Sequence, residues 1–282
     1  MKSLRRGSTP RTGRFFCKLL ALLTWVQLTQ LAAAQPAFRS TQPAPRIEYW
    51  QQRMNTIDKA LQSGAEVEAA RLVFLGDSIT DFWLLGDSPW HKDVRYGRTI
   101  WDESFGVQAG ANRALNLAVS GDRLEHVLYR IQPKRAAGLG QLDAVALDPE
   151  FVVLLIGINN SWMPEQPVVE SIVEGTRAVL DAVRARLPAA HIVLQTLLPV
   201  GEHERNQQVV RPVNKRLAAL IAEPNYARHA SLLDLHAGFV DHEGQPIPAL
   251  FVDGLHPNEA GYSVWRTRLL QHLTQERRRV GR

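Results

Sequence analysis

The stretch RLVFLGDSIT, residues 71–80, joins a continuous apolar run to a turn that carries a serine. Residues 71–75 have the length and composition of a strand buried on both faces of a sheet. Where such a strand turns into a helix, the serine projects from the sheet edge, and the helix N-terminus behind it offers unpaired N–H groups to an oxyanion. The stretch therefore predicts a buried parallel strand with a nucleophile, Ser78, at its carboxyl end.

Four more apolar segments follow this strand, and helix-like segments separate them. The strand candidates are residues 71–75, 114–119, 151–157, 191–197 and 231–235. The helix candidates are residues 47–62, 124–131, 168–187, 207–222 and 259–273. Continuous apolar strands that alternate with helices indicate a parallel sheet covered on both faces. The sequence therefore predicts an α/β fold with a doubly wound, five-stranded parallel sheet, which is a flavodoxin-like three-layer sandwich.

The expected strand order brings three short polar segments to one edge of this sheet. In a doubly wound sheet of order 2-1-3-4-5, ligands bind beyond the carboxyl ends of the strands, where the order reverses. Just past the first three strands lie Gly-Asp-Ser at 76–78, Ser-Gly-Asp at 120–122 and Gly-Ile-Asn-Asn at 157–160. Small and polar residues that emerge together at one edge are suited to binding a polarised carbonyl group.

A second segment, DGLHP at residues 253–257, supplies the rest of a catalytic set. Ser78 is a weak nucleophile until a base takes its proton, and His256 is the candidate base. Asp253 precedes this histidine by three residues, so its carboxylate can bond Nδ1, fix the tautomer and stabilise the imidazolium. We predict that Ser78, His256 and Asp253 form a catalytic triad.

Three donors are expected to hold the oxyanion: the backbone N–H groups of Ser78 and Gly121 and the side-chain amide of Asn159. A glycine at position 121 lets the backbone approach the substrate closely, where a side chain would obstruct it. Of the two carboxylates that flank the serine, Asp77 is predicted to orient the loop and Asp81 to begin the helix. Each motif alone is also typical of a turn or a surface loop. The functional interpretation depends on all of them falling in order at strand ends or in the last loop.

Together these motifs resemble the SGNH, or GDSL, hydrolase superfamily over residues 71–262. Within that range, LNLAVSGDR at 115–123 and HVLYR at 126–130 are similar to the branch that contains the catalytic subunits of platelet-activating-factor acetylhydrolase. The resemblance implies the SGNH hydrolase fold and a serine esterase activity. The superfamily usually has aspartate where this chain has Asn160, and the acetylhydrolase-like branch tends to have asparagine there.

The same resemblance assigns roles residue by residue. Ser78 corresponds to the nucleophile of the family. Gly121 and Asn159 correspond to its oxyanion donors. Asp253 and His256 correspond to the rest of its triad.

The first 34 residues have the tripartite layout of a secretory signal peptide. They hold a basic stretch that ends at Arg14, an apolar run, small residues up to Ala34 and the only cysteine of the chain, Cys17. We predict cleavage after Ala34, which gives a periplasmic or secreted protein without thiols. The alternative is an uncleaved membrane anchor, although the run is short for a full span.

The positive charge of the chain belongs to this leader. Residues 1–34 carry six of the 33 lysines and arginines and none of the 28 acidic residues, so 27 basic and 28 acidic side chains remain, a formal charge of −1. That balance argues against a nucleic-acid partner.

The rest of the chain reads as one domain, because 45% hydrophobic and 22% charged residues allow a full core. A flexible lead-in is predicted at residues 35–46, the hydrolase domain at 47–275 and a solvated basic tail at 276–282.

Motifs of three other site classes are absent. Thr80 stands where the Gly-x-Ser-x-Gly elbow of ordinary α/β-hydrolases would have its second glycine. The dinucleotide motif Gly-x-Gly-x-x-Gly and the metal motif His-Glu-x-x-His are missing, and the nine histidines are scattered. Neither a metal nor a cofactor is expected.

These observations predict an exported, metal-independent serine esterase that acts on short acyl esters. The preference for acetyl groups comes from the resemblance alone. Alternatives with the same triad are a carbohydrate O-acetylesterase, a lysophospholipase and a thioesterase, and a different class is a noncatalytic glycan-binding protein on the same fold. The catalytic subunits that the chain resembles can pair, which leaves a homodimer open, and no stable membrane span is expected after cleavage.

Loops outside these motifs are expected to recognise the alcohol. Residues 82–99 hold Trp83, Trp90 and Tyr96, which would either stack on sugar rings or pack the loop. Trp162 follows the Asn159 turn and is expected in the core, with a wall of the acyl pocket as the alternative.

Overall fold

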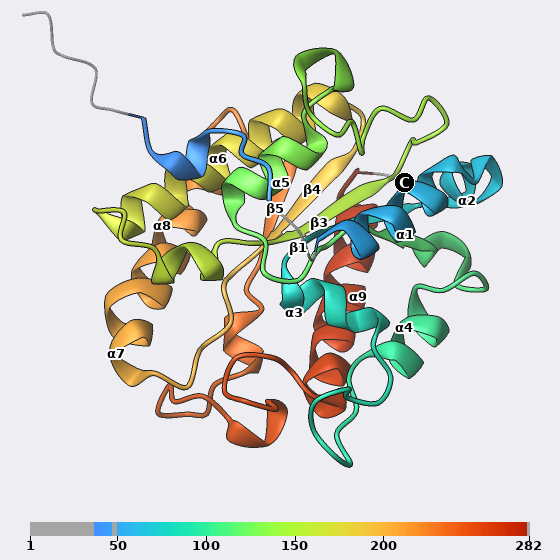
Figure 1. Ribbon diagram of the computed structural model, residues 1–282. Helices are drawn as coiled ribbons and strands as arrows, with labels where there is room; N and C mark the ends of the chain where they lie inside the picture. The colour runs from blue at the N-terminus through green and yellow to red at the C-terminus, as the bar shows by residue number, and fades with distance from the viewer. Residues whose placement is uncertain (1–36, 47–49, 281–282) are drawn as a thin grey trace, which may run out of the picture. The chain divides into compact units, whose positions relative to one another are not determined.

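The computed structural model describes residues 37–46 and 50–280 (Figure 1). The signal peptide and its cleavage site, predicted within residues 1–34, lie outside the described residues. So do residues 47–49, at the start of the first predicted helix. None of the described helices is long and apolar enough to cross a membrane.

Five strands form a parallel sheet with the order β2-β1-β3-β4-β5. They are β1 (Leu72–Gly76), β2 (Ala114–Asn116), β3 (Phe151–Leu155), β4 (His191–Gln195) and β5 (Ala230–Leu233). Strands β1, β3 and β4 are buried along their whole length, as expected for strands covered on both faces. The predicted doubly wound α/β fold is confirmed.

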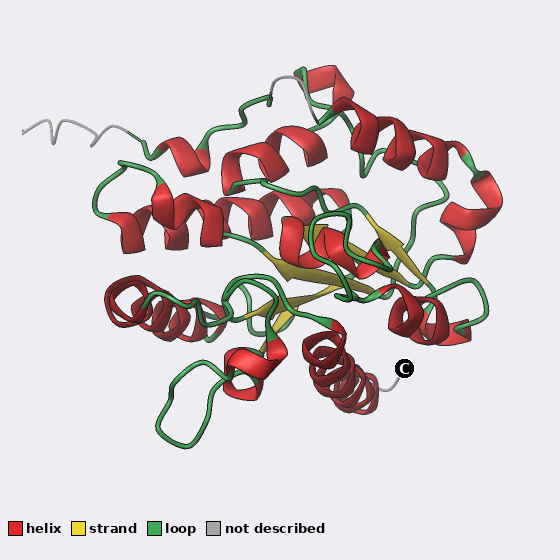
Figure 2. Cartoon of the chain, turned by 60° about the horizontal axis from the view of Figure 1, so that its bottom comes forward, coloured by secondary structure: helices red, strands yellow, loops and turns green. Residues whose placement is uncertain are grey.

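Helices cover both faces of this sheet (Figure 2). They are α1 (Gln51–Gln62), α2 (Gly64–Ala69), α3 (Ser78–Asp81), α4 (Arg98–Ser104), α5 (Leu124–Ile131), α6 (Val168–Arg186), α7 (His203–Arg205), α8 (Arg211–Ile221) and α9 (Glu259–Val280). The crossovers after β2, β3 and β4 run in one direction along the sheet and the crossover after β1 runs in the other. Because such crossovers are right-handed, their helices fall on opposite faces. Accordingly, α5 packs against α6 and α6 against α8, whereas α4 packs against α9.

An aromatic cluster ties α9 to the turn that follows α3. Trp83 is fully buried, and the centre of its ring lies 4.5 Å from that of Tyr262 and 5.2 Å from that of Trp265. Ser78 precedes this turn, and His256 precedes α9. Aromatic packing therefore helps to hold together two chain segments that carry predicted triad residues.

The C-terminal helix extends further than the sequence suggests. Helix α9 continues to Val280, so the basic segment predicted as a tail at 276–282 is helical through that residue. The guanidinium of Arg277 donates to the carboxylate of Glu150 at 3.0 Å and lies 5.4 Å from the centre of the Phe151 ring. The prediction of a solvated tail is wrong for Arg277, because its charge is paired on the domain.

The other differences concern the ends of elements. The segment predicted as a helix at 207–222 begins with a π-helical turn, Asn206–Val210, before α8. The Asn206 side chain accepts from the N–H of Val200 at 2.8 Å and donates to its carbonyl at 2.5 Å. These two bonds hold the π-helical turn against the loop that follows β4. Strands β2, β3, β4 and β5 also end earlier than predicted.

Candidate active site

Ser78 and His256 are 178 positions apart in the sequence and lie within hydrogen-bond distance of each other. The imidazole Nε2 is 2.9 Å from the serine Oγ, and Nδ1 is 2.8 Å from Oδ2 of Asp253. The structure therefore brings the three residues of the predicted triad together, with the histidine between the serine and the carboxylate.

The loop that carries Asp253 and His256 is held by its own backbone. Oδ1 of Asp253 accepts from the N–H groups of Leu255 at 3.0 Å and His256 at 2.8 Å. Gly254 has a φ of +77°, which glycine adopts without steric cost, and its carbonyl accepts from the N–H of Gly201 at 2.7 Å. Burial raises the pKa of Asp253, but the hydrogen bonds from His256 and Leu255 outweigh it and leave this pKa below its ordinary value. The carboxylate is therefore ionised beside the imidazole at neutral pH.

The turn after β1 places Ser78 at the start of α3. Asp77 is the N-cap of this helix, and its Oδ1 accepts from the N–H of Ile79 at 3.0 Å. The prediction that Asp77 orients the loop is confirmed. A Cβ on Gly76 would come within 2.5 Å of the carbonyl oxygen of Leu155, so only glycine fits between β1 and β3.

The buried Asp77 predicts a pH-dependent stability. Burial raises the pKa of Asp77 to about 7. The hydrogen bond from Ile79 lowers this pKa and the charge of Asp122 raises it, but both effects are smaller than that of burial. The unfolded chain loses this proton near pH 4, so the folded state holds one more proton between about pH 4 and pH 7. Stability is therefore lost as the pH rises through this window.

Asp77→Asn keeps a capping oxygen and cannot titrate there. Relative to the unsubstituted protein, the free energy of unfolding of this variant should rise with pH, by up to about 1.4 kcal/mol per pH unit between about pH 4 and pH 7. Urea unfolding of both proteins at pH 4, 5.5 and 7 measures the difference between their free energies of unfolding. The contributions of the other titrating groups are the same in both proteins and largely cancel in this difference. A difference that stays constant with pH would show that Asp77 does not titrate in this range.

Gly121 and Asn159 line the same pocket as Ser78 and His256, a hollow of about 380 Å³. Gly121 has a φ of +77°. The Asn159 side-chain nitrogen donates to the backbone carbonyl of Asp122 at 2.8 Å. An amide nitrogen carries two hydrogens, so the second can be donated to a substrate oxygen. All five predicted site residues therefore meet at the carboxyl edge of the sheet.

A fully buried carboxylate, Asp122, supports this side of the pocket. Its Oδ2 accepts from Nε of Arg130 at 2.7 Å, and its Oδ1 accepts from Nε1 of Trp50 at 3.0 Å and from Nη1 of Arg46 at 3.1 Å. We call these four residues the buried clamp. Because the backbone carbonyl of Asp122 also holds the amide of Asn159, the clamp fixes a predicted oxyanion donor. Sequence reasoning missed the clamp, since its members come from separate segments. The prediction of a flexible lead-in at residues 35–46 is wrong for Arg46, because this residue is bonded to the domain.

Asp81 joins the serine turn to the loop that follows β2. Its Oδ2 accepts from the N–H of Ser120 at 3.0 Å, and its Oδ1 lies 2.9 Å from Nε of Arg53. Asp81 is the acidic residue in the first turn of α3, as expected for a residue at the helix start, but it does not cap the helix. Asp77 already occupies the capping position, which leaves the side chain of Asp81 to contact the neighbouring loop.

The sequence matches the family described as GDSL-like lipase/acylhydrolase over residues 74–264. The chain belongs to this family. The platelet-activating factor acetylhydrolase IB subunit alpha1 of Bos taurus is 30% identical to this acylhydrolase over 219 residues, which cover 74% of this chain and 79% of that protein. The resemblance to the acetylhydrolase subunits is therefore confirmed as distant homology.

Solved structures share the fold of this acylhydrolase. A GDSL-like lipase from Bacteroides thetaiotaomicron matches with a TM-score of 0.54 at 17% identity, over 78% of this chain and 98% of that chain. The acetyl xylan esterase AlAXEase matches with a TM-score of 0.51 at 18% identity, over 71% and 98% of the two chains. The family assignment makes this acylhydrolase a carboxylic ester hydrolase.

Asn160 of the acylhydrolase stabilises the start of α5. Its Oδ1 accepts from the N–H of Leu124 at 3.1 Å, and its Nδ2 donates to the carboxylate of Glu125 at 2.9 Å. An ionised aspartate at this position could not donate to Glu125.

His126 lies in the first turn of the same helix. Its Nδ1 accepts from the N–H of Arg123 at 3.0 Å, and burial lowers the pKa of His126 to about 4. This histidine is therefore neutral at neutral pH and caps the helix.

Trp162 lies outside the pocket of the acylhydrolase. Its side chain is 42% exposed, and the guanidinium of Arg205 lies 4.6 Å from the centre of the ring. The prediction that Trp162 packs in the core is wrong, because a cation–π contact holds the ring at the surface.

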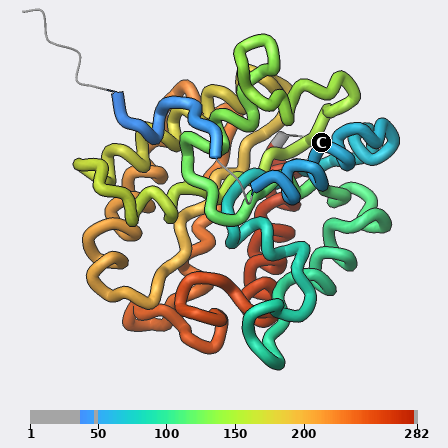
Figure 3. The backbone as a smooth tube through the Cα atoms, viewed as in Figure 1, coloured from blue at the N-terminus to red at the C-terminus, as the bar shows by residue number. Residues whose placement is uncertain are grey.

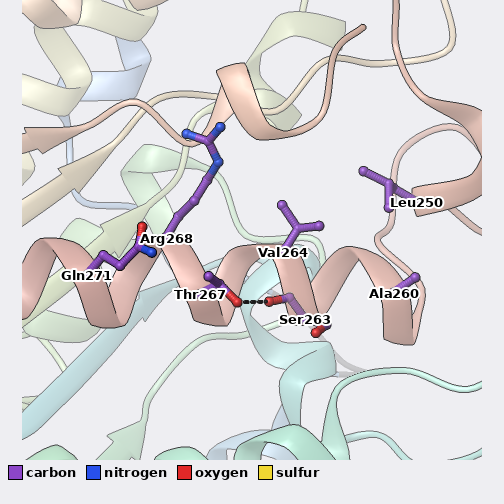
Figure 4. A pocket seen from close by; sticks show the side chains of 7 residues that line it. All are labelled: Leu250, Ala260, Ser263, Val264, Thr267, Arg268 and Gln271. Atoms are coloured by element: carbon purple, nitrogen blue, oxygen red, sulfur yellow. Dashed lines mark hydrogen bonds between the residues drawn. The ribbon is translucent and has the colours of Figure 1, made fainter.

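A larger hollow along α9 offers no catalytic group (Figure 4). Its volume is about 660 Å³, and it is lined by Leu250, Ala260, Ser263, Val264, Thr267, Arg268 and Gln271. The hydroxyl of Thr267 donates to the carbonyl of Ser263 at 2.9 Å, and no base lies among the lining residues.

Within residues 37–46 and 50–280, no group of three histidine, cysteine or acidic residues is placed to hold a metal ion.

Proposed function

We propose that this acylhydrolase is an exported serine esterase that cleaves short acyl esters, acetyl esters above all, through an acyl-enzyme on Ser78. The observation that carries the proposal is the 2.9 Å contact between Oγ of Ser78 and Nε2 of His256, with Asp253 2.8 Å from the other ring nitrogen. An isolated serine hydroxyl is a poor nucleophile, and an adjacent imidazole held by a carboxylate activates it.

In the proposed mechanism, His256 takes the proton of Ser78 as Oγ attacks the ester carbonyl, and Asp253 stabilises the imidazolium that forms. Negative charge develops on the carbonyl oxygen, which the N–H groups of Ser78 and Gly121 and the amide of Asn159 stabilise. His256 then protonates the leaving alcohol, and the acyl group stays on the serine. Water activated by the same imidazole releases the acid and restores the hydroxyl.

Two observations support a short acyl group. The Bos taurus relative is named an acetylhydrolase. The pocket around Ser78 has an apolar wall, but the polar residues Ser120, Asn159 and His91 also line it. A long hydrocarbon chain would displace water from these groups without replacing its hydrogen bonds, which disfavours binding. An acetyl group requires much less of this displacement.

Hydrolysis of p-nitrophenyl acetate, butyrate and octanoate by the purified protein, with and without EDTA, tests the proposal. We expect turnover that falls with chain length and does not respond to the chelator. Faster turnover of the octanoate would contradict the short-acyl preference, and sensitivity to EDTA would contradict a metal-independent mechanism. Failure to hydrolyse any of the three esters would favour the noncatalytic glycan-binding alternative.

Replacing Asn159 by alanine is expected to lower kcat on p-nitrophenyl acetate by about 10²–10³, with a smaller change in KM, because the donor is needed most when charge develops. Asn160→Ala is the matched control, since the Asn160 amide bonds Glu125 and Leu124. The control should lower stability but keep kcat of the folded protein within about tenfold of the unsubstituted enzyme. Equal losses of kcat in both variants would contradict the assigned role of Asn159.

The leader predicted at residues 1–34 supports the proposed export. A mature protein whose N-terminal sequence begins at Gln35, recovered from the periplasm or the medium, is the expected result. A full-length chain found only in the membrane fraction would support the anchor instead. We also propose that the protein forms a homodimer, which sedimentation equilibrium would detect.

A further inference from the structure

A second hollow opens beside the active-site pocket and shares a wall with it. Its volume is about 510 Å³, and Phe82, Trp90 and Ser120 line both hollows. Leu84 and Leu85 add an apolar surface. The loop between α3 and α4, teal in Figure 3, projects beyond the neighbouring helices and supplies part of this wall. We call this second hollow the side groove.

The shared wall stands next to the catalytic histidine. The ring of Phe82 lies between the imidazole of His256, 4.9 Å away, and the indole of Trp90, 5.4 Å away, centre to centre. In the proposed function, His256 protonates the leaving alcohol, so the leaving oxygen must come within hydrogen-bond reach of Nε2. Because Phe82 packs beside this imidazole and also lines the side groove, we infer that the alcohol part of the ester extends toward the side groove.

Trp90 is unusual in this wall because 62% of its surface is exposed. An exposed indole presents a broad apolar face with negative charge density, on which the C–H face of a ring can pack. The side groove is also lined by the exposed polar side chains of Gln52, Thr56 and Arg98, the last of which bonds Asp102 through Nε. A groove that combines an apolar platform with donors and acceptors suits a ligand with one apolar face and several hydroxyl groups.

We propose that the side groove binds the sugar part of an acylated carbohydrate, with Trp90 as the stacking platform. This inference rests on the proposed esterase function and names the alcohol that it releases. The sugar would pack on Trp90, exchange hydrogen bonds with Gln52, Thr56 and Arg98, and place its ester in the pocket of Ser78.

A charged pair in the side groove argues against a hydrocarbon chain as its occupant. Arg53 and Asp81 line the groove at 2.9 Å from each other, and their side chains are only 17% and 15% exposed. A lipid chain would remove the remaining water from this pair and offer no hydrogen bond in return, which is costly for buried charges. Sugar hydroxyls can replace the water.

The test compares two acetate esters that differ in the alcohol. Acetate release is measured from an acetylated methyl glucoside and from ethyl acetate, whose ethanol has no ring that could stack on Trp90. In Trp90→Ala, the ratio of kcat/KM for the sugar ester to that for ethyl acetate should fall about tenfold or more, mainly through KM for the sugar. Trp90→Phe, which keeps an aromatic face, should recover part of the loss.

Two further variants make the test specific. Thr56→Trp fills the side groove from the exposed surface of α1 and should lower the same ratio. Trp162→Ala removes another exposed tryptophan, outside both hollows, and should leave the activity on both esters within about twofold. If neither Trp90→Ala nor Thr56→Trp changes the ratio, the side groove does not bind the sugar.

Other outcomes separate this inference from the proposed function. If the enzyme cleaves ethyl acetate but no acetylated sugar, the inference fails and the esterase function stands. If it cleaves neither these esters nor p-nitrophenyl acetate, the proposed function itself fails. A preference for an acetylated lysophospholipid that Trp90→Ala abolishes would assign the side groove to a lipid and overturn the inference.

Discussion

The Ser78→Ala variant is expected to lose at least about four orders of magnitude in kcat on p-nitrophenyl acetate while it keeps its fold. The substitution removes the oxygen that forms the acyl-enzyme, and the oxyanion donors alone give only weak catalysis. Ser78 is 6% exposed, and the smaller methyl group fits the same space, so the free energy of unfolding should change little. Steady-state kinetics and urea unfolding of one preparation measure both quantities.

Ser161→Ala is the matched control for this loss. Ser161 is also buried and lies two positions beyond Asn159, and its hydroxyl oxygen accepts from Arg205 at 3.3 Å. Its removal should change kcat less than about tenfold. A fluorophosphonate probe should label the unsubstituted enzyme and leave Ser78→Ala unlabelled. If Ser78→Ala retains more than about 1% of the turnover, another nucleophile carries the reaction.

Arg130→Met is expected to lower the free energy of unfolding by about 3–5 kcal/mol, because it leaves the buried charge of Asp122 without its principal partner. The guanidinium is fully buried, and its Nη1 also donates to the carbonyl of Leu117 at 2.6 Å and to Oε1 of Gln141 at 2.5 Å. These acceptors lose a donor in the same substitution, which adds to the cost. Urea unfolding at neutral pH measures the loss.

Two comparisons test whether the loss of stability in Arg130→Met comes from the buried clamp. Arg216→Met removes an exposed pair with Glu170, whose side chains are 46% and 41% exposed, and should cost less than about 1 kcal/mol. The double variant Asp122→Asn, Arg130→Met should be more stable than the sum of the two single losses predicts, because neither charge is then left alone. Strict additivity would contradict a coupled pair.

The fold and the candidate site follow from local sequence patterns. Continuous apolar runs predict the buried strands, and the handedness of crossovers between parallel strands explains the observed layers. The motifs that hold Ser78, Gly121 and Asn159 follow the first three strands, so the strand order alone brings them to one edge. Asp253 and His256 share a single turn, and their mutual contact is therefore local. The roles of these five residues in catalysis stay predictions that the variants above test.

The supporting contacts could not be predicted in this way, because they depend on partners far apart in the sequence. Arg130 sits in a helix where a charged residue normally faces solvent, and only the folded chain shows it on Asp122. Arg277 belongs to a basic run without apolar periodicity, and its partner Glu150 lies 127 positions away. Large aromatic rings are usually buried, so the sequence predicts burial for Trp162 as well. Only the folded chain shows that Arg205 contacts this ring at the surface.

The bond between Ser78 and His256 spans 178 positions, and this distance has a consequence for how the enzyme becomes active. Contacts between distant segments form late, because the entropy of closing a long loop must be offset by other contacts first. Strand β1 ends just before Ser78, and the other four strands lie between Ser78 and His256 in the sequence. A nascent chain therefore has no working centre until nearly the whole sheet has been synthesised and folded, so recovery of ester hydrolysis during refolding reports the completion of folding.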